Sequence, residues 1–545
     1  MSHLDPLVEF ARPATIGRLR RARALQASGL IGLAGTLPWL LGRGPSLGVL
    51  SRIQGIAHGP KPAVIDRTGT VSWRDLDRRS DRMGRVLDAE GIGAGDRVAL
   101  LLRNGREFVE TLVGAQKLGA TACPLNTWAA RGELGAALED LRPAALVYDV
   151  RHAEPLGPVV PPGVTSIAVG DDPRGLLPGA EAYEGLLAAQ DAGPVSPLAR
   201  RRGTPRIVIQ TSGTTGRPKG ASREGTGRGL GGLSALLERI PFRADDVTVC
   251  PAPLFHAFGL LNVTLSMLLG STLVLPDAYD PEGTLAMIDR HRATTTSLVP
   301  VMLHRILALP DEVRHRHDLR SLRIVLVSGS ALSSDLRERA GGTFGDVIYD
   351  LYGSTEAGWV AVAAPEDARR GAGSVGRPVE GVNVTILDPS GRPVPTGEHG
   401  EIHVRTEARF EGYVSGGQDR GREGLFPLGD VGWLDDEGFL HVEGRADDMA
   451  VIGGENVYPA EVEEVIRGVD GVEEVAVAAI PDPEYGQALA AFVVGPADPE
   501  AVLEACRRDL ASFKVPRRVE PLDELPRTAT GKVRRGVLVE RIAKE

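Results

Sequence analysis

"TSGTTGRPKG", from Thr211 to Gly220, is the stretch that decides the fold of this chain. It follows the β-branched run Ile207–Ile209, which predicts a short buried strand. A strand that opens into a loop of glycines and small hydroxyl residues indicates a phosphate cradle, because glycine lets backbone N–H groups approach an oxyanion closely. A flexible surface loop is the alternative interpretation of these ten residues.

The loop is not a Walker A motif, which requires the pattern Gly-x-x-x-x-Gly-Lys-Ser/Thr. Counted from Gly213, the sixth position is Pro218, and the residue after Lys219 is Gly220. A phosphate bound here would therefore be held in another geometry, in which side-chain hydroxyls supply much of the contact.

The bulk composition narrows the class of protein. A chain of 545 residues predicts two or three domains, and 42% apolar with 25% charged residues is typical of a globular enzyme. The net charge of −10 argues against general nucleic-acid binding. Cys123, Cys250 and Cys506 are too far apart to suggest a disulfide framework or a zinc site. We expect a reducing, cytoplasmic setting.

An uncharged run near the N-terminus, residues 24–42, follows the basic sequence "RLRRARA". Its length is close to that of a membrane span, but Gln26, Ser28 and Pro38 dilute its apolar character. We interpret residues 20–50 as a surface element that makes a peripheral contact with the inner face of the membrane. A helix packed on the globular part is the alternative.

From Lys61 onward, short apolar strands alternate with amphipathic helices. "RVALLLR" (97–103) predicts a buried strand, and "GREFVETLVGAQKLG" (105–119) predicts a helix that Gly119 closes. Ser72 and Asp75 form a capping-box pattern before another helix. Such alternation predicts an α/β fold with parallel sheets covered by helices.

The pattern changes twice toward the C-terminus. Residues 381–405 hold two alternating strands around Pro/Gly turns, which predicts a small β-rich subdomain. After about Ala446 the chain predicts a small α+β unit with a helix over 499–513. We therefore divide the chain into an N-terminal extension, a large domain and a small mobile domain, at residues 1–55, 56–445 and 446–545.

Three further polar segments stand between apolar strands. "YGSTE" (352–356) offers an aromatic face, two hydroxyls and a carboxylate that could stack a base and hold a hard cation. In "LGDVGWLDDEGFLHVEGRADD", Asp430 could accept ribose hydroxyls, and Arg445 could reinforce that contact. Near the C-terminus, "PRTATGKVRR" presents Lys532 behind a glycine. A turn, a hairpin and a solvated basic tail are the respective alternatives.

Taken together, these motifs resemble the adenylate-forming superfamily of acyl-CoA synthetases, peptide-synthetase adenylation domains and luciferases. The resemblance covers about residues 50–540, and "PLFHAFG" and "GGENVYPAEVE" add to it in the superfamily's order. It implies that the opening loop closes over the phosphates of ATP.

The resemblance also implies a role for each matching residue. Lys532 is implied as the catalytic lysine, acting with Thr355 at the α-phosphate and Glu356 as the ligand of Mg²⁺. The implied triphosphate-binding residues are Thr211, Ser212, Gly213, Thr214, Thr215, Gly216 and Lys219. The implied adenine and ribose residues are Gly329, Ser330, Ala331, Asp350, Tyr352, Gly353, Asp430 and Arg445. Asp447 is implied as the hinge of the small domain.

By the same resemblance, a carboxylic acid and ATP form an acyl-adenylate, and coenzyme A then displaces AMP to give the thioester. Gly453 and Gly454 would line the CoA channel. His256, Phe258 and Trp359 would line the acyl pocket, with a core histidine as the alternative for His256. No acidic residue follows the aromatic of "LFHAFGLLN", so an amino acid is not expected as substrate.

A medium- or long-chain fatty acid is the acid that the resemblance favours. The alternatives are an aryl or branched acid, a fatty-acyl-AMP ligase that serves a carrier protein, and a silent lipid-binding protein on the same fold. The sequence departs from the superfamily after Lys219, where "ASREGTGRGLG" lacks the usual histidine and puts the following helix in doubt, and at Leu428, where a threonine is usual. The sequence indicates no oligomeric state.

Overall fold

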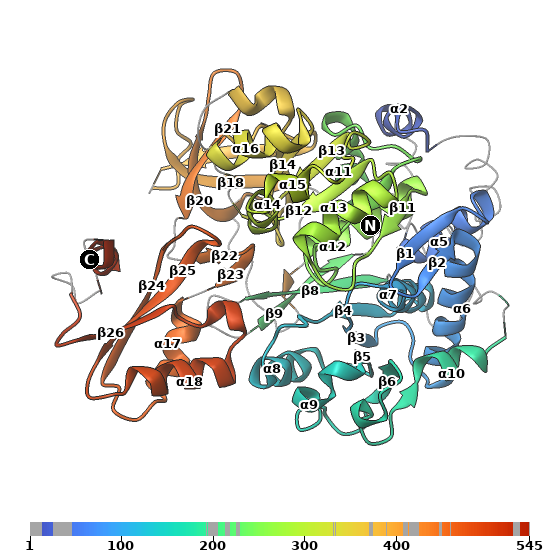
Figure 1. Ribbon diagram of the computed structural model, residues 1–545, viewed down its shortest axis with the longest axis horizontal. Helices are drawn as coiled ribbons and strands as arrows, with labels where there is room; N and C mark the ends of the chain where they lie inside the picture. The colour runs from blue at the N-terminus through green and yellow to red at the C-terminus, as the bar shows by residue number, and fades with distance from the viewer. Residues whose placement is uncertain are drawn as a thin grey trace.

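The structure is a computed structural model, and it describes residues 13–24, 46–191, 193, 205–212, 218–224, 229–330, 332, 334–369, 374–388, 390–406, 412–413, 424–445, 450–457, 459–526, 533 and 535–543. Figure 1 shows a large body built on two long sheets and a smaller body formed by the C-terminal residues. This is the α/β fold class that the sequence predicts.

The first long sheet is parallel in its centre and antiparallel at both edges. Its inner strands, such as the fully buried "IVLV" run of β13, are apolar on both faces, as expected where helices cover both sides of a parallel sheet. In spatial order the strands are β16 (Arg377–Pro378), β15 (Gly358–Ala363), β14 (Ile348–Ser354), β13 (Ile324–Val327), β12 (Thr295–Leu298), β10 (Val247–Val249), β11 (Thr272–Val274), β1 (Pro62–Asp66) and β2 (Gly69–Ser72).

The second long sheet is parallel from β8 to β7 and ends in an antiparallel edge formed by β9 and β19. The glycine-rich loop joins β8 to β9, so its two ends belong to a hairpin. In spatial order the strands are β19 (Gly412–Tyr413), β9 (Pro218–Glu224), β8 (Arg206–Ser212), β4 (Thr121–Pro124), β3 (Arg97–Leu101), β5 (Ala145–Asp149), β6 (Thr165–Val169) and β7 (Glu181–Ala182).

Helices cover these two sheets, and two of the predicted helix ends are confirmed. Ser72 caps α6, where its hydroxyl accepts from the backbone of Asp75 at 3.1 Å, and Gly119 closes α7 with a left-handed φ of 79°. The helix after the glycine-rich hairpin is present as α11. The helices of the large body are α5 (Leu47–Ala57), α6 (Trp73–Ala89), α7 (Arg106–Leu118), α8 (Arg131–Leu141), α9 (Ala153–Leu156), α10 (Tyr183–Ala188), α11 (Gly229–Arg239), α12 (Ala257–Leu269), α13 (Pro281–Arg290), α14 (Pro300–Leu307), α15 (Asp311–Arg314) and α16 (Ser334–Phe344).

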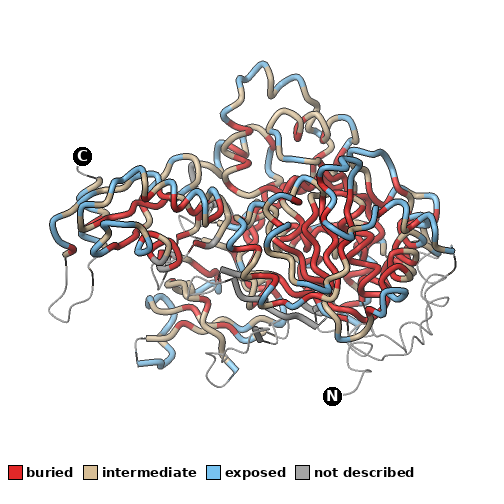
Figure 2. The backbone as a smooth tube through the Cα atoms, turned by 90° about the horizontal axis from the view of Figure 1, so that it is seen from below, coloured by how far each residue is buried: buried red, intermediate tan, exposed pale blue. Residues whose placement is uncertain are grey.

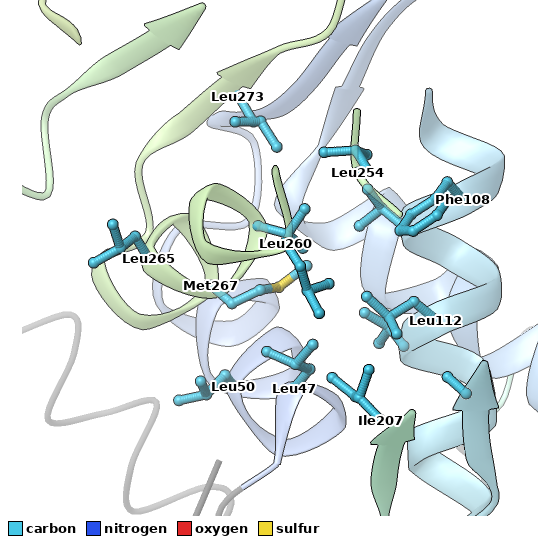
Figure 3. Packing of buried hydrophobic residues seen from close by; sticks show 14 of the residues in the cluster. Leu47, Leu50, Phe108, Leu112, Ile207, Leu254, Leu260, Leu265, Met267 and Leu273 are labelled. Carbon is cyan, nitrogen blue, oxygen red and sulfur yellow. The ribbon is translucent and has the colours of Figure 1, made fainter. Parts of the chain in front are cut away.

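The largest hydrophobic core lies between the two long sheets. Figure 3 shows side chains of α5, α7, α12 and β8 meeting there, with Leu47, Leu112 and Leu260 among them. Figure 2 shows that buried backbone fills the large body and continues, in smaller amount, into the C-terminal body. Each body therefore has its own core.

The β-rich subdomain predicted from residues 381–405 is an antiparallel sheet. Its strands are β17 (Val382–Leu387), β18 (Gly400–Thr406), β20 (Phe426–Leu434) and β21 (Leu440–Arg445). Asp435 lies in the turn between β20 and β21, where it accepts backbone hydrogen bonds from Glu437 and Phe439. The hairpin interpretation of this turn is confirmed.

The C-terminal body is a small α+β unit. It contains the pair β22 (Ala450–Ile452) and β23 (Glu455–Val457), the sheet of β24 (Glu474–Asp482), β25 (Gly486–Val494) and β26 (Arg518–Leu522), and the helices α17 (Pro459–Arg467), α18 (Pro499–Asp509) and α19 (Arg535–Ala543). The predicted helix over 499–513 was too long. It ends at Asp509 because Leu510 is extended and buried in the core, and a short turn, η4 (Ser512–Lys514), follows.

Near the N-terminus, the helix α2 (Pro13–Arg21) packs on the large body. Leu19 and Ala22 are buried in its core, and Arg18 pairs with Glu238 of α11 at 2.7 Å. Most of the uncharged run 24–42 lies outside the described residues. Within the part that is described, no helix combines the length and apolar character needed to cross a membrane.

Candidate active site

A cavity of about 1860 Å³ lies between the two bodies, and both contribute to its walls. The large body supplies residues from α12, α14, α16, β14, β15 and β20, and the small body supplies residues from β22 to β25. The candidate residues that line it are His256, Phe258, Gly329, Ser330, Asp350, Tyr352, Gly353, Thr355, Trp359, Asp430, Gly453 and Gly454. Candidate residues up to 198 positions apart in the sequence therefore line the same cavity, since His256 and Gly454 both belong to its lining.

The strand ends of the glycine-rich hairpin are the described part of the predicted phosphate loop. Thr211 pairs with Lys219 and Ser212 pairs with Pro218 across β8 and β9. The tip, residues 213–217, lies outside the described residues, and it includes Gly213, Thr214, Thr215 and Gly216. The hairpin register places Lys219 opposite Thr211, which brings two of the candidate phosphate residues side by side on the backbone.

A second hairpin, β14 to β15, carries the "YGSTE" motif. Tyr352 and Gly353 lie in β14, and Thr355 and Glu356 lie in the turn that leads to β15. Gly353 lies against the backbone carbonyl of Gly358, at a spacing that leaves no room for a Cβ atom. This close approach explains why the motif needs glycine directly after its aromatic residue.

Tyr352 and Asp430 meet across the seam between the central sheet and the β-rich subdomain. The Tyr352 hydroxyl donates to Oδ2 of Asp430 at 2.5 Å. Asp430 also pairs on the backbone with Arg445, in the neighbouring strand β21. The predicted base-stacking and ribose-binding residues are therefore neighbours on one wall of the cavity.

Asp350 lies two residues before Tyr352 and is buried. Burial raises the pKa of its carboxyl group to about 6, and the nearby Arg337 guanidinium, 3.4 Å away, offsets only part of that rise. The carboxyl group thus takes up a proton more readily than an exposed aspartate does.

The glycine loop of the small body lies directly against the predicted adenine site. Gly453 and Gly454 have positive φ angles of 59° and 92°. A Cβ atom on Gly454 would lie 3.5 Å from Cγ1 of Val299 and 4.0 Å from the carbonyl oxygen of Gly329. Only a residue without a side chain keeps a narrow gap open here.

His256 faces the small body. It lies at the N-terminal end of α12, and its Nε2 contacts the carboxylate of Glu455, in β23. The imidazole ring lies 4.3 Å from the ring of Phe255, and Trp128 approaches Phe255 edge-on at 5.4 Å. With 30% of its side chain exposed, His256 is part of a cavity wall, and the alternative of a core histidine does not hold.

Two more candidate residues, Phe258 and Trp359, line the cavity where it approaches the main core. Both are partly buried against that core. This end of the cavity is therefore the apolar one.

Several candidate residues cannot be placed. Ala331, Asp447 and Lys532 lie outside the described residues, and Arg445 is described only by its backbone. On either side of Lys532, Leu525 and Val533 pack on the sheet of the small body, and Arg535 donates to the carbonyl of Val477 at 3.0 Å.

The described residues include no cluster of three or more His, Cys, Asp or Glu side chains that could hold a metal. Glu356 offers a single carboxylate next to Thr355, which lines the cavity. One carboxylate is a suitable protein contribution for Mg²⁺, since that ion takes its remaining ligands from phosphate oxygens and water. The residues present therefore fit a magnesium ion that arrives with a nucleotide.

Sequence reasoning missed several residues of the cavity wall. Glu455 stands inside the quoted "GGENVYP" motif, yet its contact with His256 could not be read from spacing. Trp128, Arg305 and Tyr485 also line the cavity, and no motif singles them out. Their places depend on how the two bodies meet, which a linear pattern does not encode.

Comparisons with known proteins agree on one family. The profile described as "AMP-binding enzyme" matches residues 54–414, and the profile "AMP-binding enzyme C-terminal domain" matches residues 461–532. Feruloyl-CoA synthase of Amycolatopsis sp is 37% identical over 88% of this chain and 95% of its own. The long-chain-fatty-acid–CoA ligase FadD13 of Mycobacterium tuberculosis is 32% identical over 86% of this chain and 93% of its own.

Among solved structures, the amide bond synthetase McbA from Marinactinospora thermotolerans superimposes with a TM-score of 0.80 at 29% identity. The match covers 91% of this chain and 99% of that one. The two-body architecture is therefore shared along nearly the whole length.

Proposed function

The chain belongs to the AMP-binding enzyme family and is an AMP-forming acyl-CoA synthetase; we propose that its substrate is a carboxylic acid with an uncharged, apolar side chain, with a medium- or long-chain fatty acid as first candidate. The observation that carries the apolar character is the cavity wall at Phe258 and Trp359, which continues into the main core. An acyl chain bound there would leave water for an apolar surface, which is favourable by about 25 cal/mol per Å² buried.

We assign the first half-reaction to the large body with Lys532. The acid carboxylate attacks the α-phosphorus of ATP, the bond to the β-phosphate oxygen breaks, and pyrophosphate leaves. Both reactants are anions, so positive charge must offset their repulsion in the transition state. Lys532 and the Lys219 hairpin would supply that charge, and Glu356 would hold the magnesium ion, which withdraws further charge from the phosphates.

The nucleotide would lie along Gly329, Tyr352 and Asp430, which share one wall of the cavity. The Asp430 carboxylate would accept the ribose hydroxyls, and Tyr352 would lie beside the adenine ring. In the second half-reaction the thiol sulfur of CoA attacks the acyl carbon, the acyl–phosphate bond breaks, and AMP leaves while the thiol proton passes to solvent. Gly453 and Gly454 would give the pantetheine arm its narrow passage, with Asp447 as the hinge between the two steps.

An aryl acid is the second candidate, and one observation favours it. The relative named for feruloyl, an aryl-propenoyl group, is more similar to this chain than the relative named for long-chain fatty acids, at 37% against 32% identity. The aromatic cluster of Trp128, Phe255 and His256 beside the cavity would also suit a flat ring.

The test is a panel of acids with ATP, magnesium and CoA, scored by AMP formation. The panel runs from acetate to stearate and includes ferulate and benzoate. We expect dodecanoate or palmitate to give the largest kcat/KM. A tenfold preference for ferulate would replace the fatty acid by the aryl acid. Acyl-adenylate that forms without any CoA thioester would favour a ligase that serves a carrier protein, and no AMP with any acid would end the proposal.

A further inference from the structure

The ammonium group of Lys514 is shared by two carboxylates that belong to different bodies. Lys514 closes η4, in the small body, and its Nζ donates to Oε1 of Glu461, in α17 of the same body, at 2.7 Å. The same Nζ donates to Oε1 of Glu133, in the first turn of α8, at 2.5 Å. None of the three side chains is more than 7% exposed. Together they form a buried triad across the seam.

The two sides of this triad are anchored in separate cores. Leu134 and Leu138 of α8 pack with the second long sheet, whereas Val462 of α17 packs in the core of the small body. Figure 1 shows α8 at the edge of the large body that faces the C-terminal body, where it contacts α18. A Cβ atom on Gly132 would lie 3.8 Å from the carbonyl oxygen of Asp509, so the start of α8 meets the end of α18.

Removing one partner from this triad is costly. Burial by itself would lower the pKa of Lys514, but the two carboxylates outweigh it and raise that pKa. Burial also raises the pKa of Glu461 to about 7, against the attraction of Lys514. A charge that stays buried without its partner is strongly destabilised, so substitution of Glu133 should destabilise the docked arrangement, in which Lys514 stays buried.

The arrangement that the triad favours is the one in which the small body is docked as in this structure. In this structure the loop of Gly453 and Gly454 lies against Gly329, at the predicted nucleotide site. A rotation of the small body would carry Lys514 and Glu461 together, since both belong to it. The same rotation would separate Lys514 from Glu133. The Glu133 contact is therefore specific to the docked glycine loop.

We propose that Glu133 is a positioning residue for the thioester half-reaction, holding Lys514 and thereby the small body where the glycine loop faces the nucleotide site; this inference rests on the proposed function. Neither Glu133 nor Lys514 lines the cavity, so neither touches the reacting atoms. The rate of the first half-reaction, which needs Lys532 and a rotated small body, does not depend on this contact.

The variant Glu133→Gln tests the proposal with little risk to the helix. Oε2 of Glu133 accepts from the backbone N–H of Ala130 at 2.9 Å, and glutamine fills the same capping position. We expect acid-dependent pyrophosphate release without CoA to stay within about twofold. Thioester formation from supplied acyl-adenylate should fall about tenfold, the scale for one hydrogen bond to a charged group. The matched control is Glu139→Gln, on the exposed face of the same helix, which should change neither rate.

A double variant and an exchange measurement complete the test. If Glu133 acts through Lys514, then Glu133→Gln with Lys514→Gln should lose no more thioester activity than Lys514→Gln alone. Hydrogen exchange of residues 126–141, measured without substrates, should be faster in Glu133→Gln than in the unmodified chain. That readout does not require catalysis, so it stands even if the proposed function fails. Equal loss in both half-reactions, no loss in either, or unchanged exchange would overturn the inference.

Discussion

The hydroxyl of Tyr352 donates a hydrogen bond to Oδ2 of Asp430 at 2.5 Å, and this contact joins the central sheet to the β-rich subdomain. Tyr352 lies near the end of β14, and Asp430 lies in the middle of β20, 78 positions later in the sequence. The contact fixes the carboxylate beside the aromatic ring. A nucleoside site requires this arrangement, because the ring lies beside the base and the carboxylate accepts the ribose hydroxyls. It also fixes the direction in which the remaining carboxylate lone pairs point.

Substitutions at this contact should distinguish a residue that binds the ribose, Asp430, from a residue that only positions it, Tyr352. Asp430→Asn removes the charge that would accept two ribose hydroxyls, and we expect the KM for ATP to rise about tenfold, since hydrogen bonds to charged groups contribute about 1.5–3 kcal/mol. Tyr352→Phe keeps the ring and loses only the supporting donor, so a rise of about threefold is expected. Initial rates over a range of ATP concentrations measure both. A larger effect of Tyr352→Phe than of Asp430→Asn would contradict the assignment.

The sequence predicts the features that depend on neighbouring residues better than those that depend on residues far apart in the chain. Ser72 and Gly119 were predicted correctly because helix ends depend on neighbouring residues and on φ. The strand before Thr211 was also predicted, but its partner β9 was not, since "PKGASRE" has no apolar alternation. The helix over 499–513 was overestimated because the burial of Leu510, a tertiary effect, ends it early.

The second prediction concerns the division of labour at Lys532. Lys532→Ala should lower adenylation by about 10²–10³-fold, the scale for one preorganised donor at a developing charge. Thioester formation from supplied acyl-adenylate should be nearly unchanged, because rotation of the small body withdraws Lys532 from the site before that step. Pyrophosphate release and CoA thioester formation measure the two steps separately. Arg541→Ala, an exposed cation in the last turn of α19, is the matched control, and an equal loss in both steps would refute the assignment.

The third prediction concerns the glycine loop. Gly454→Ala places an L-residue at a φ of 92°, which costs about 1–3 kcal/mol, and adds a methyl group 3.5 Å from Val299. We expect the thioester step to slow about tenfold, with adenylation within about twofold. Gly438→Ala is the control for backbone strain alone, since its φ is 81° and its Cβ would meet no atom within 4 Å. A matching loss in that control would remove the argument for a narrow channel.

The arrangement of the two bodies was beyond sequence reasoning. The motifs identified the glycine loop and the large-body residues separately, but no pattern indicated that Glu455 contacts His256 or that Glu133 contacts Lys514. Both contacts join residues of different bodies, at separations of 199 and 381 positions. Such contacts depend on a rigid-body arrangement, and each can be lost while every local pattern is kept.

The last prediction concerns the carboxyl group of Asp350. Burial raises the pKa of this group from 3.8 to about 6. Between these values the folded chain holds a proton that the unfolded chain has already lost. The free energy of unfolding therefore decreases as the pH rises from about 4 to about 6, and the favourable contribution is complete only below pH 4. Because Asp350→Asn cannot ionise, the variant should gain stability relative to the unmodified chain over that window, by up to roughly 3 kcal/mol, and the difference should be level above about pH 7.

Arg337 lowers the pKa of Asp350, so Arg337→Gln should extend the window to higher pH. Urea unfolding curves from pH 4 to pH 8, followed by tryptophan fluorescence, measure all three proteins. A stability difference that decreases with rising pH would mean that attraction to Arg337 outweighs burial at this carboxyl group.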